Sequence, residues 1–214
     1  GYWLRKYIVS GIYLFVGLRM GVGALILLKK GHLDTELSRY KYQRKRWKKA
    51  GYTNIDLSLQ YEIMLQCFAN VTFLVIPAIL QAFNPQEFLS LLEILGYLLW
   101  LVSFGMEHFA DIQKQQFFKK AFLENRKKQV CNVGLWKYSR HPNYLGEILF
   151  WFGLFGFSLS QSFDNFWLII CPLSMLAMFI FASIPMMDNR SLERRPDYEE
   201  DMKKTPALIP SLFK

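Results

Sequence analysis

Five long windows of this sequence contain almost no charged side chains, and this feature constrains the fold most. They cover about residues 7–28, 57–83, 87–106, 144–159 and 166–187. A membrane-spanning helix needs about 20 predominantly apolar residues, whereas a soluble domain distributes charges along each exposed helix face. The windows therefore predict an all-α, polytopic transmembrane bundle of about five spanning helices.

The charges lie between these windows. Five passes place segments 29–56, 107–143 and 188–214 on one side of the membrane, and these segments contain 23 of the 26 Lys and Arg residues. Short cytoplasmic loops are enriched in Lys and Arg. We therefore expect the polar loops and C-terminal tail on the cytoplasmic or matrix face. The endoplasmic reticulum and the mitochondrial inner membrane both fit this topology.

A basic run at residues 39–49 includes the aromatic residues Tyr40, Tyr42 and Trp47. Such a run has three alternative partners: anionic lipid headgroups, the phosphate of a bound ligand, or single-stranded nucleic acid. Because the run directly follows the first window, and aromatic side chains suit the membrane interface, lipid contact is favoured. Membrane lipids are the predicted partner, and no nucleic acid is expected.

The three cysteines, Cys67, Cys131 and Cys171, are far apart in the sequence. A disulfide framework or a zinc ribbon requires clustered cysteines. We expect buried thiols that pack in the core, and no metal site.

Candidate site residues begin at the end of the third window. Glu107, Asp111 and Lys114 follow an i, i+4, i+7 spacing, which places them on one face of a continued helix. A solvated charged face is an equally good interpretation of this spacing.

A second polar segment, 134–147, precedes and enters the fourth window. It contains Arg140, His141, Asn143, Tyr144 and Glu147. Asn143 follows Pro142 and is expected to cap the fourth helix. Glu147 lies one turn inside the apolar window, where its carboxyl needs a donor. Asn143, Arg140 or a ligand hydroxyl are candidates for that donor.

The tail after the fifth window contains Arg190, Arg194 and Arg195. Arginines at a membrane face suit a polyanion such as a nucleotide diphosphate. The tail contains as many acidic as basic residues, so pairing within the tail is the alternative.

Three blocks carry a resemblance to a known family. They are 110–119 (Ala-Asp-x-Gln-Lys-x-x-Phe-Phe-Lys), 134–147 (Gly-Leu-Trp-Lys-Tyr-Ser-Arg-His-Pro-Asn-Tyr-Leu-Gly-Glu) and 190–198 continuing to Ile209-Pro210. The sequence resembles the C-terminal domain of steroid 5α-reductases and of a related family of membrane reductase-like proteins. The resemblance divides the chain into N-terminal membrane helices with a basic loop, 1–106, and a reductase-like region, 107–214.

The resemblance implies a helical membrane protein that binds NADPH and reduces a carbon–carbon double bond in a lipid or steroid-like substrate. Asp111, Asn143 and Glu147 match positions that hold the nicotinamide or its ribose. Arg190 and Tyr198 match the segment that closes over the nucleotide. Lys114, Arg140, His141 and Tyr144 lie within the matching blocks and complete the predicted cofactor site, and no residue is assigned as catalytic.

The sequence departs from the family pattern. Asp188 stands where Glu is usual, and Asp201 where a second Tyr is usual. Family reductases also have further N-terminal helices, which would lie before Gly1 and carry the acidic and tyrosine groups that polarise the substrate carbonyl. A non-catalytic accessory subunit of a larger membrane complex, for example a respiratory one, is therefore an alternative that needs no NADPH.

A second alternative is an S-adenosylmethionine-dependent lipid methyltransferase, because isoprenylcysteine and phospholipid methyltransferases are similar around 140–146. The activity therefore stays open between a reductase and these two alternatives.

Overall fold

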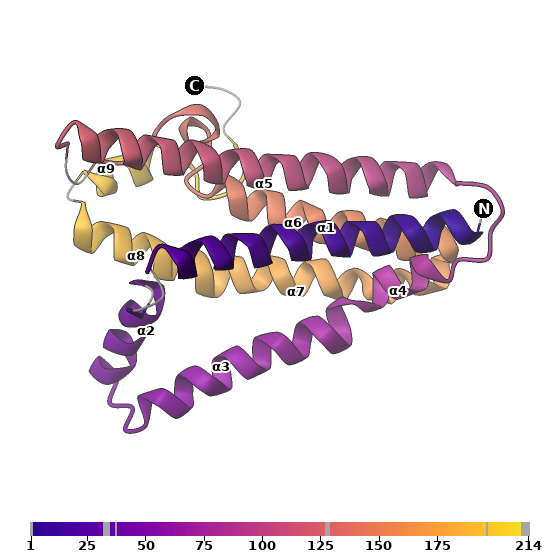
Figure 1. Cartoon of the computed structure of the whole chain (residues 1–214), viewed down its shortest axis with the longest axis horizontal. Coiled ribbons are helices and arrows are strands. Elements are labelled where there is room, and N and C mark those ends of the chain that lie inside the picture. Colours follow the sequence, from indigo (N-terminus) through magenta and orange to yellow (C-terminus); the bar gives the residue numbers. More distant parts are fainter. Residues whose placement is uncertain (1, 32–34, 37, 127–128, 196, 211–214) are drawn as a thin grey trace. The chain divides into compact units, whose positions relative to one another are not determined.

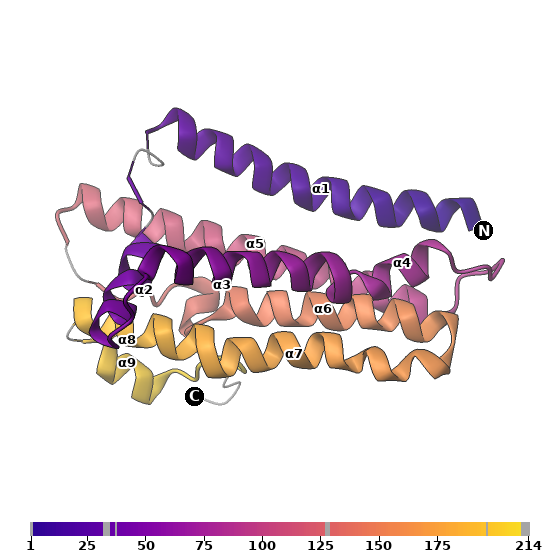
Figure 2. The same cartoon turned by 90° about the horizontal axis from the view of Figure 1, so that it is seen from below.

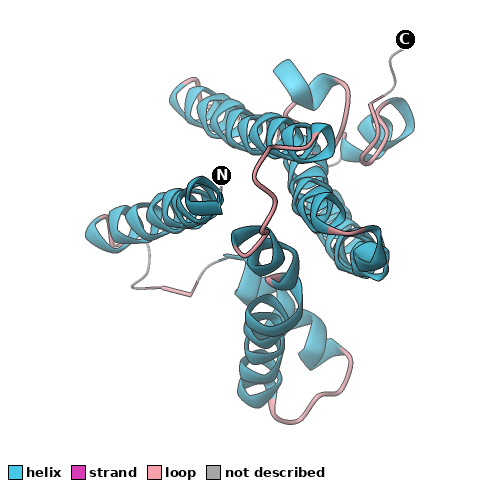
Figure 3. Cartoon of the chain, turned by 90° about the vertical axis from the view of Figure 1, so that its right-hand side faces the viewer, coloured by secondary structure: helices cyan, strands magenta, loops and turns pink. Residues whose placement is uncertain are grey.

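The computed structural model describes residues 2–31, 35–36, 38–126, 129–195 and 197–210. Figures 1 and 3 show helices joined by loops, and no strand occurs in these described ranges. The chain divides into two compact units, residues 1–88 and residues 89–214. The expected all-α architecture is confirmed.

The N-terminal unit contains four α-helices and one π-helical turn among its described residues. Their bounds are α1 Tyr2–Lys29, α2 Ser38–Lys49, α3 Ile55–Ala69, η1 Asn70–Leu74 and α4 Ile76–Ala82. In this unit α1 packs against α4. The buried guanidinium of Arg5 donates hydrogen bonds to the carbonyl oxygens of Gln86 and Phe88, which follow α4. This contact satisfies polar groups of the loop beside an apolar helix.

The C-terminal unit contains the remaining helices. Their bounds are α5 Leu91–Leu123, η2 Gly134–Lys137, α6 Pro142–Gln161, η3 Phe163–Ile169, α7 Ile170–Met178, η4 Phe179–Ser183, α8 Ile184–Arg194 and α9 Tyr198–Lys204. Figure 2 shows α5, α6 and α7 running side by side, and α6 contacts both of its neighbours. The unit is therefore a helical bundle with α6 between α5 and α7.

Among the described residues, four helical stretches are long and apolar enough to cross a membrane, so this is a membrane protein. They are Trp3–Lys29, Ile55–Ala82, Leu91–Leu123 and Phe163–Arg194. The fourth window forms α6, whose 20 residues extend about 30 Å. It is not among the four. The expected polytopic bundle is confirmed with four such stretches among the described residues, against the about five that the sequence predicted.

Some boundaries differ from the sequence expectation. The third helix begins at Leu91, because the Ser90 hydroxyl accepts the N–H of Glu93 and caps it. It continues to Leu123, as expected for a helix extending beyond its apolar window. The cysteines are unpaired, with Cys131 and Cys171 buried as predicted. Cys67 is exposed on α3, so the expectation that it is buried was wrong.

Close contact between α5 and α6 depends on glycine. A Cβ placed on Gly146 would lie 2.9 Å from the Ser103 carbonyl oxygen and the Glu107 nitrogen of α5. A Cβ on Gly153 would lie 3.0 Å from the Trp100 nitrogen. Because these neighbours are backbone atoms, the two helices can approach this closely at these positions since α6 has no side chain there. This packing places the polar first turn of α6 beside Glu107 and Asp111, in the middle of α5.

Candidate functional site

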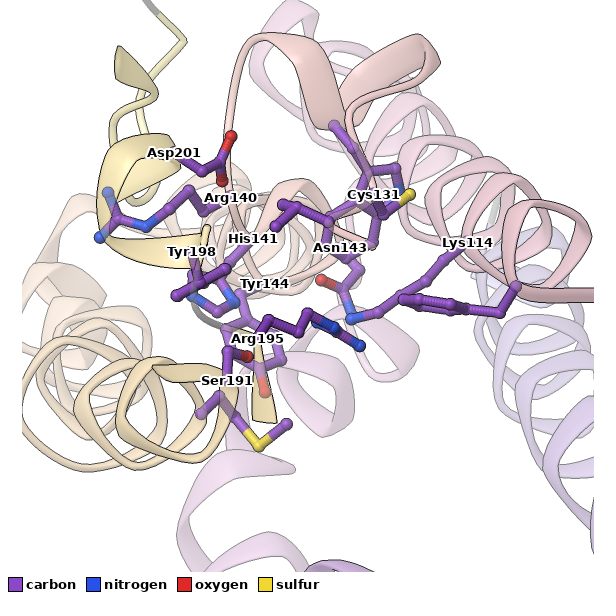
Figure 4. A pocket seen from close by; sticks show the side chains of 14 residues that line it. Lys114, Cys131, Arg140, His141, Asn143, Tyr144, Ser191, Arg195, Tyr198 and Asp201 are labelled. Carbon is purple, nitrogen blue, oxygen red and sulfur yellow. The ribbon is translucent and has the colours of Figure 1, made fainter. Parts of the chain in front are cut away.

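A pocket lies in the C-terminal unit where five elements meet. Residues from α5, η2, the start of α6, α8 and α9 line it (Figure 4). The lining residues are Lys114, Phe118, Val130, Cys131, Trp136, Arg140, His141, Asn143, Tyr144, Met187, Ser191, Arg195, Tyr198 and Asp201. Polar and charged side chains thus converge next to helices that span the membrane.

Asp188 on α8 organises one wall of this pocket. Its carboxylate accepts hydrogen bonds from the Arg140 guanidinium at 2.9 Å and from the Tyr198 hydroxyl at 2.5 Å. It also contacts His141 Nε2 at 2.8 Å. All four side chains are nearly inaccessible to solvent, so each contact is stronger than its equivalent at the surface. Burial and the hydrogen bond to Asp188 raise the pKa of Tyr198, which keeps its hydroxyl a donor.

Arg140 also attaches the C-terminal segment to the pocket. Its guanidinium donates to the carbonyl oxygens of Thr205 at 2.6 Å and Met202 at 3.2 Å. The backbone N–H of Arg140 donates to Pro206, and that of His141 donates to Ala207. The segment after α9 is therefore held against residues 140–141 by side-chain and backbone hydrogen bonds together.

Lys114 and Arg195 bring two positive charges to the opposite part of the pocket (Figure 4). The Lys114 ammonium lies 4.2 Å from the centre of the Trp136 ring, and the Arg195 guanidinium lies 4.8 Å from that of Phe118. Within the described part of the chain, no carboxylate forms an ion pair with either group. Burial lowers the pKa of Arg195, which reflects the cost of desolvating its charge. An anion in this space would offset that cost.

Asn143, in the first turn of α6, also lines the pocket. The Asn143 side-chain nitrogen donates to the Asp111 carboxylate of α5 at 3.3 Å. Its Oδ1 atom is buried and accepts no hydrogen bond from the described residues. The expected capping role of Asn143 was wrong, because His141 is the N-cap residue and Pro142 occupies the first helical position.

A turn at Gly134 places Trp136 beneath Lys114. Gly134 has φ +54°, a left-handed conformation that favours glycine. The Gln113 side chain of α5 accepts the N–H of Leu135 at 2.9 Å, and the Trp136 indole donates to the carbonyl of Ala110 at 2.8 Å. These two bonds attach η2 to α5, and Trp136 packs with the buried thiol of Cys131.

The structure brings together many of the residues that the sequence singled out. Lys114, Arg140, His141, Asn143, Tyr144 and Tyr198 line the pocket. Asp111 lies behind Asn143, as its hydrogen bond shows. Glu147 lies one turn further along α6 and Arg190 lies on α8, and neither lines the pocket. The donors considered for Glu147 have other partners, since Arg140 bonds Asp188 and Asn143 bonds Asp111.

Sequence reasoning missed several functional residues. Asp188, which binds the lining residues Arg140, His141 and Tyr198 but does not itself line the pocket, was noted only as a departure from the family pattern. Arg195, which does line the pocket, was noted only as part of a basic tail. Trp136, Cys131 and Ser191 also line the pocket. Trp136 lies in the block 134–147, so its presence there was a usable signal. The position of Asp188 opposite Arg140 and His141 depends on how α8 folds back, which no local pattern indicates.

The pocket is narrow. Its cavity has a volume of about 40 Å³, which holds a few water molecules. A wider groove of about 470 Å³ shares Val130 and Asp201 with the pocket. A ligand larger than a phosphate therefore requires side chains to move apart.

Comparison with known proteins identifies relatives but no activity. The uncharacterized protein C594.04c of Schizosaccharomyces pombe (strain 972 / ATCC 24843) is 37% identical over 131 residues. That match covers 53% of this chain and 38% of the yeast protein, so it spans well under half of that relative. No solved structure matches the chain. Residues 1–205 match a family model described as "Protein of unknown function (DUF1295)", and the chain belongs to this family.

Proposed function

We propose that this protein is a membrane-embedded, NADPH-dependent reductase of a carbon–carbon double bond in a lipid or steroid-like substrate. One observation carries the proposal: Lys114 and Arg195 line a buried pocket beside Asn143, and neither cation forms an ion pair with a described carboxylate. The type of reaction is proposed from the sequence resemblance to steroid 5α-reductases, and the groups proposed to bind the cofactor are those that line the pocket.

The two cations suit a phosphate group of the cofactor. Both are backed by aromatic rings, Trp136 for Lys114 and Phe118 for Arg195. Charge-assisted hydrogen bonds from Lys and Arg to phosphate are about twice as strong as neutral ones. Because the Arg195 guanidinium is partly shielded from water here, a phosphate oxygen would replace part of the interaction that the guanidinium loses with water.

Asn143 suits an amide ligand. Its buried Oδ1 accepts no hydrogen bond from the described residues, so it lacks a donor. A buried acceptor without a donor costs about 1–3 kcal/mol, and the carboxamide N–H of a nicotinamide would satisfy it. Asp111 holds the other end of the Asn143 side chain and so fixes its orientation.

These residues fit the cofactor in chemistry, although the pocket has to widen to admit it. The groove that shares Val130 and Asp201 provides room for a molecule longer than the pocket. When bound, NADPH would supply the hydride for the reduction. The contribution of the chain is to hold the phosphate through Lys114 and Arg195 and to orient the nicotinamide amide through Asn143.

Equilibrium titration of the purified full chain in detergent tests this proposal. NADPH should quench intrinsic fluorescence saturably, and Lys114→Gln or Arg195→Gln should weaken binding at least tenfold, about 1.4 kcal/mol. Lys119→Gln is the matched control, because Lys119 is exposed on the same helix. S-adenosylmethionine is titrated in parallel to test the methyltransferase alternative. No binding of NADPH at millimolar concentration by the folded protein would contradict the proposal.

A second candidate is a non-catalytic accessory subunit of a larger membrane complex. It is favoured by the narrowness of the pocket and by Arg140, His141 and Tyr198, which are all engaged with Asp188. Blue-native electrophoresis in mild detergent separates the two candidates. An accessory subunit migrates with partner chains, whereas migration as a single 25.3 kDa chain with its lipid and detergent contradicts that role.

A further inference from the structure

Helix α2 of the N-terminal unit is attached to its own chain through Arg44 and Gln43. The Arg44 guanidinium bonds the carboxylates of Glu36, at 2.5 Å, and of Asp56 in the first turn of α3. Gln43 donates to Glu62 of α3 at 3.2 Å. These contacts fix how α2 is rotated relative to the start of α3.

Four lysines lie together on another face of α2. Lys41, Lys45, Lys48 and Lys49 follow an i, i+4, i+7, i+8 spacing, which aligns them along one side of a helix. All four are exposed. We call these four residues the lysine face. At about 100° per residue, the lysine face lies opposite Gln43 and next to Arg44 on the surface of α2.

The position of α2 in the chain keeps this face near the membrane. The helix lies between the candidate spans Trp3–Lys29 and Ile55–Ala82. Five residues separate its end from Ile55, and such a segment extends at most about 18 Å. The electrostatic attraction of an anionic surface acts over about 8–10 Å at physiological salt. The contact of Arg44 with Asp56 brings α2 to the first turn of the following span.

We propose that the lysine face binds the anionic surface of the membrane in which the protein is embedded. The partner is the layer of negatively charged phospholipid headgroups around the helix, for which clustered lysines beside a span are well suited. Tyr42 and Trp47 are half-buried on the same helix and suit the interface between headgroups and water. This inference concerns the N-terminal unit and does not depend on the cofactor pocket.

Hydrogen exchange of the full chain in nanodiscs tests the proposal. Amide exchange in α2 is compared between phosphatidylcholine alone and phosphatidylcholine with one-third phosphatidylserine. We expect α2 exchange to be at least fivefold slower in the anionic nanodiscs, and this difference to shrink in high salt. Equal exchange in the two bilayers overturns the proposal without the use of any variant. Free inorganic phosphate or a short RNA is also added to the neutral nanodiscs. If either slows α2 exchange as much as the anionic lipid does, the proposal is overturned.

Two variants of equal net charge localise the effect. In the first, glutamine replaces the four residues of the lysine face, and the fivefold difference should fall below twofold. In the matched control, glutamine replaces four exposed lysines of the C-terminal unit, which are Lys119, Lys120, Lys137 and Lys203. The control should keep the fivefold difference. An equal loss in both variants would attribute the effect to total charge and overturn the proposal.

Discussion

At the scale of single residues, Asp188 shows how one buried carboxylate can join three segments. It binds Arg140 and His141, which precede α6, and Tyr198, the first residue of α9. A buried charge is stable only when it is paired and hydrogen-bonded. The side chains that the sequence assigned to a cofactor therefore also hold the fold of the C-terminal unit together.

Replacing Asp188 by Asn should destabilise the protein strongly. The change leaves the buried Arg140 guanidinium without its carboxylate, which typically costs about 3–5 kcal/mol. Thermal unfolding in detergent measures the loss. Tyr198→Phe removes one hydrogen bond to the same carboxylate and should cost about 1.5–3 kcal/mol. Equal stability of the wild type and Asp188→Asn would show that Asp188 does not hold the segments together.

Gly134 should tolerate no side chain. Its φ is +54°, and a Cβ there would lie 2.4 Å from the Gln113 side chain, which accepts the N–H of Leu135. Gly134→Ala should therefore cost about 1–3 kcal/mol through backbone strain and displacement of Gln113. Gly105→Ala is the matched control, because a Cβ there meets nothing within 4 Å. We expect the control to keep the unfolding temperature of the wild type, and a similar loss in both variants would refute the explanation.

At the scale of helices, the α5–α6 pair and the α8–α9 pair position the pocket. The first pair depends on glycines that let two backbones meet, and the second on the contact between Asp188 and Tyr198. Sequence patterns predicted the helices well, since apolar windows indicate helix lengths directly. They did not predict Ser90 as the start of α5 or His141 as the N-cap of α6, because capping depends on local geometry.

Gly146→Ala should separate the two central helices. The new methyl group would lie 2.9 Å from backbone atoms of Ser103 and Glu107, which cannot rotate away as a side chain can. Overpacking of this kind typically costs about 1–3 kcal/mol. The unfolding temperature and the affinity for NADPH should both fall, because Asn143 lies one turn earlier on α6. Gly156→Ala, whose Cβ has its nearest neighbour at 3.4 Å, should change both quantities much less.

The contribution of the Tyr198 hydroxyl to the docking of α9 should be lost in strongly alkaline solution. Burial and the hydrogen bond to Asp188 raise the pKa of Tyr198 above that in the unfolded chain, which is near 10. Its contribution to stability is therefore complete below pH 10 and is lost as pH rises towards the folded-state value. The stability difference between the wild type and Tyr198→Phe should be constant from pH 7 to about 9 and shrink above pH 10. A difference that disappears near pH 7 would contradict this assignment.

At the scale of the whole molecule, sequence and structure agree on a helical membrane protein. The sequence also indicated most of the polar residues that meet in the pocket, since six of the nine predicted positions line it. The pairing of Asp188 with Arg140 and His141 was not predictable, because 48 residues separate Asp188 from Arg140 along the chain. Contacts of that kind depend on how the helices pack against one another, and this packing cannot be inferred from a single sequence.

The central claim is that the pocket beside Asn143 binds NADPH. A density map of the full chain in nanodiscs, with millimolar NADPH present, tests it most directly. We predict density for a nucleotide in contact with Lys114, Arg195 and Asn143, with the pocket wider than its present cavity of about 40 Å³. A map of equal quality that shows these three side chains well ordered, with no nucleotide beside them, would contradict the account.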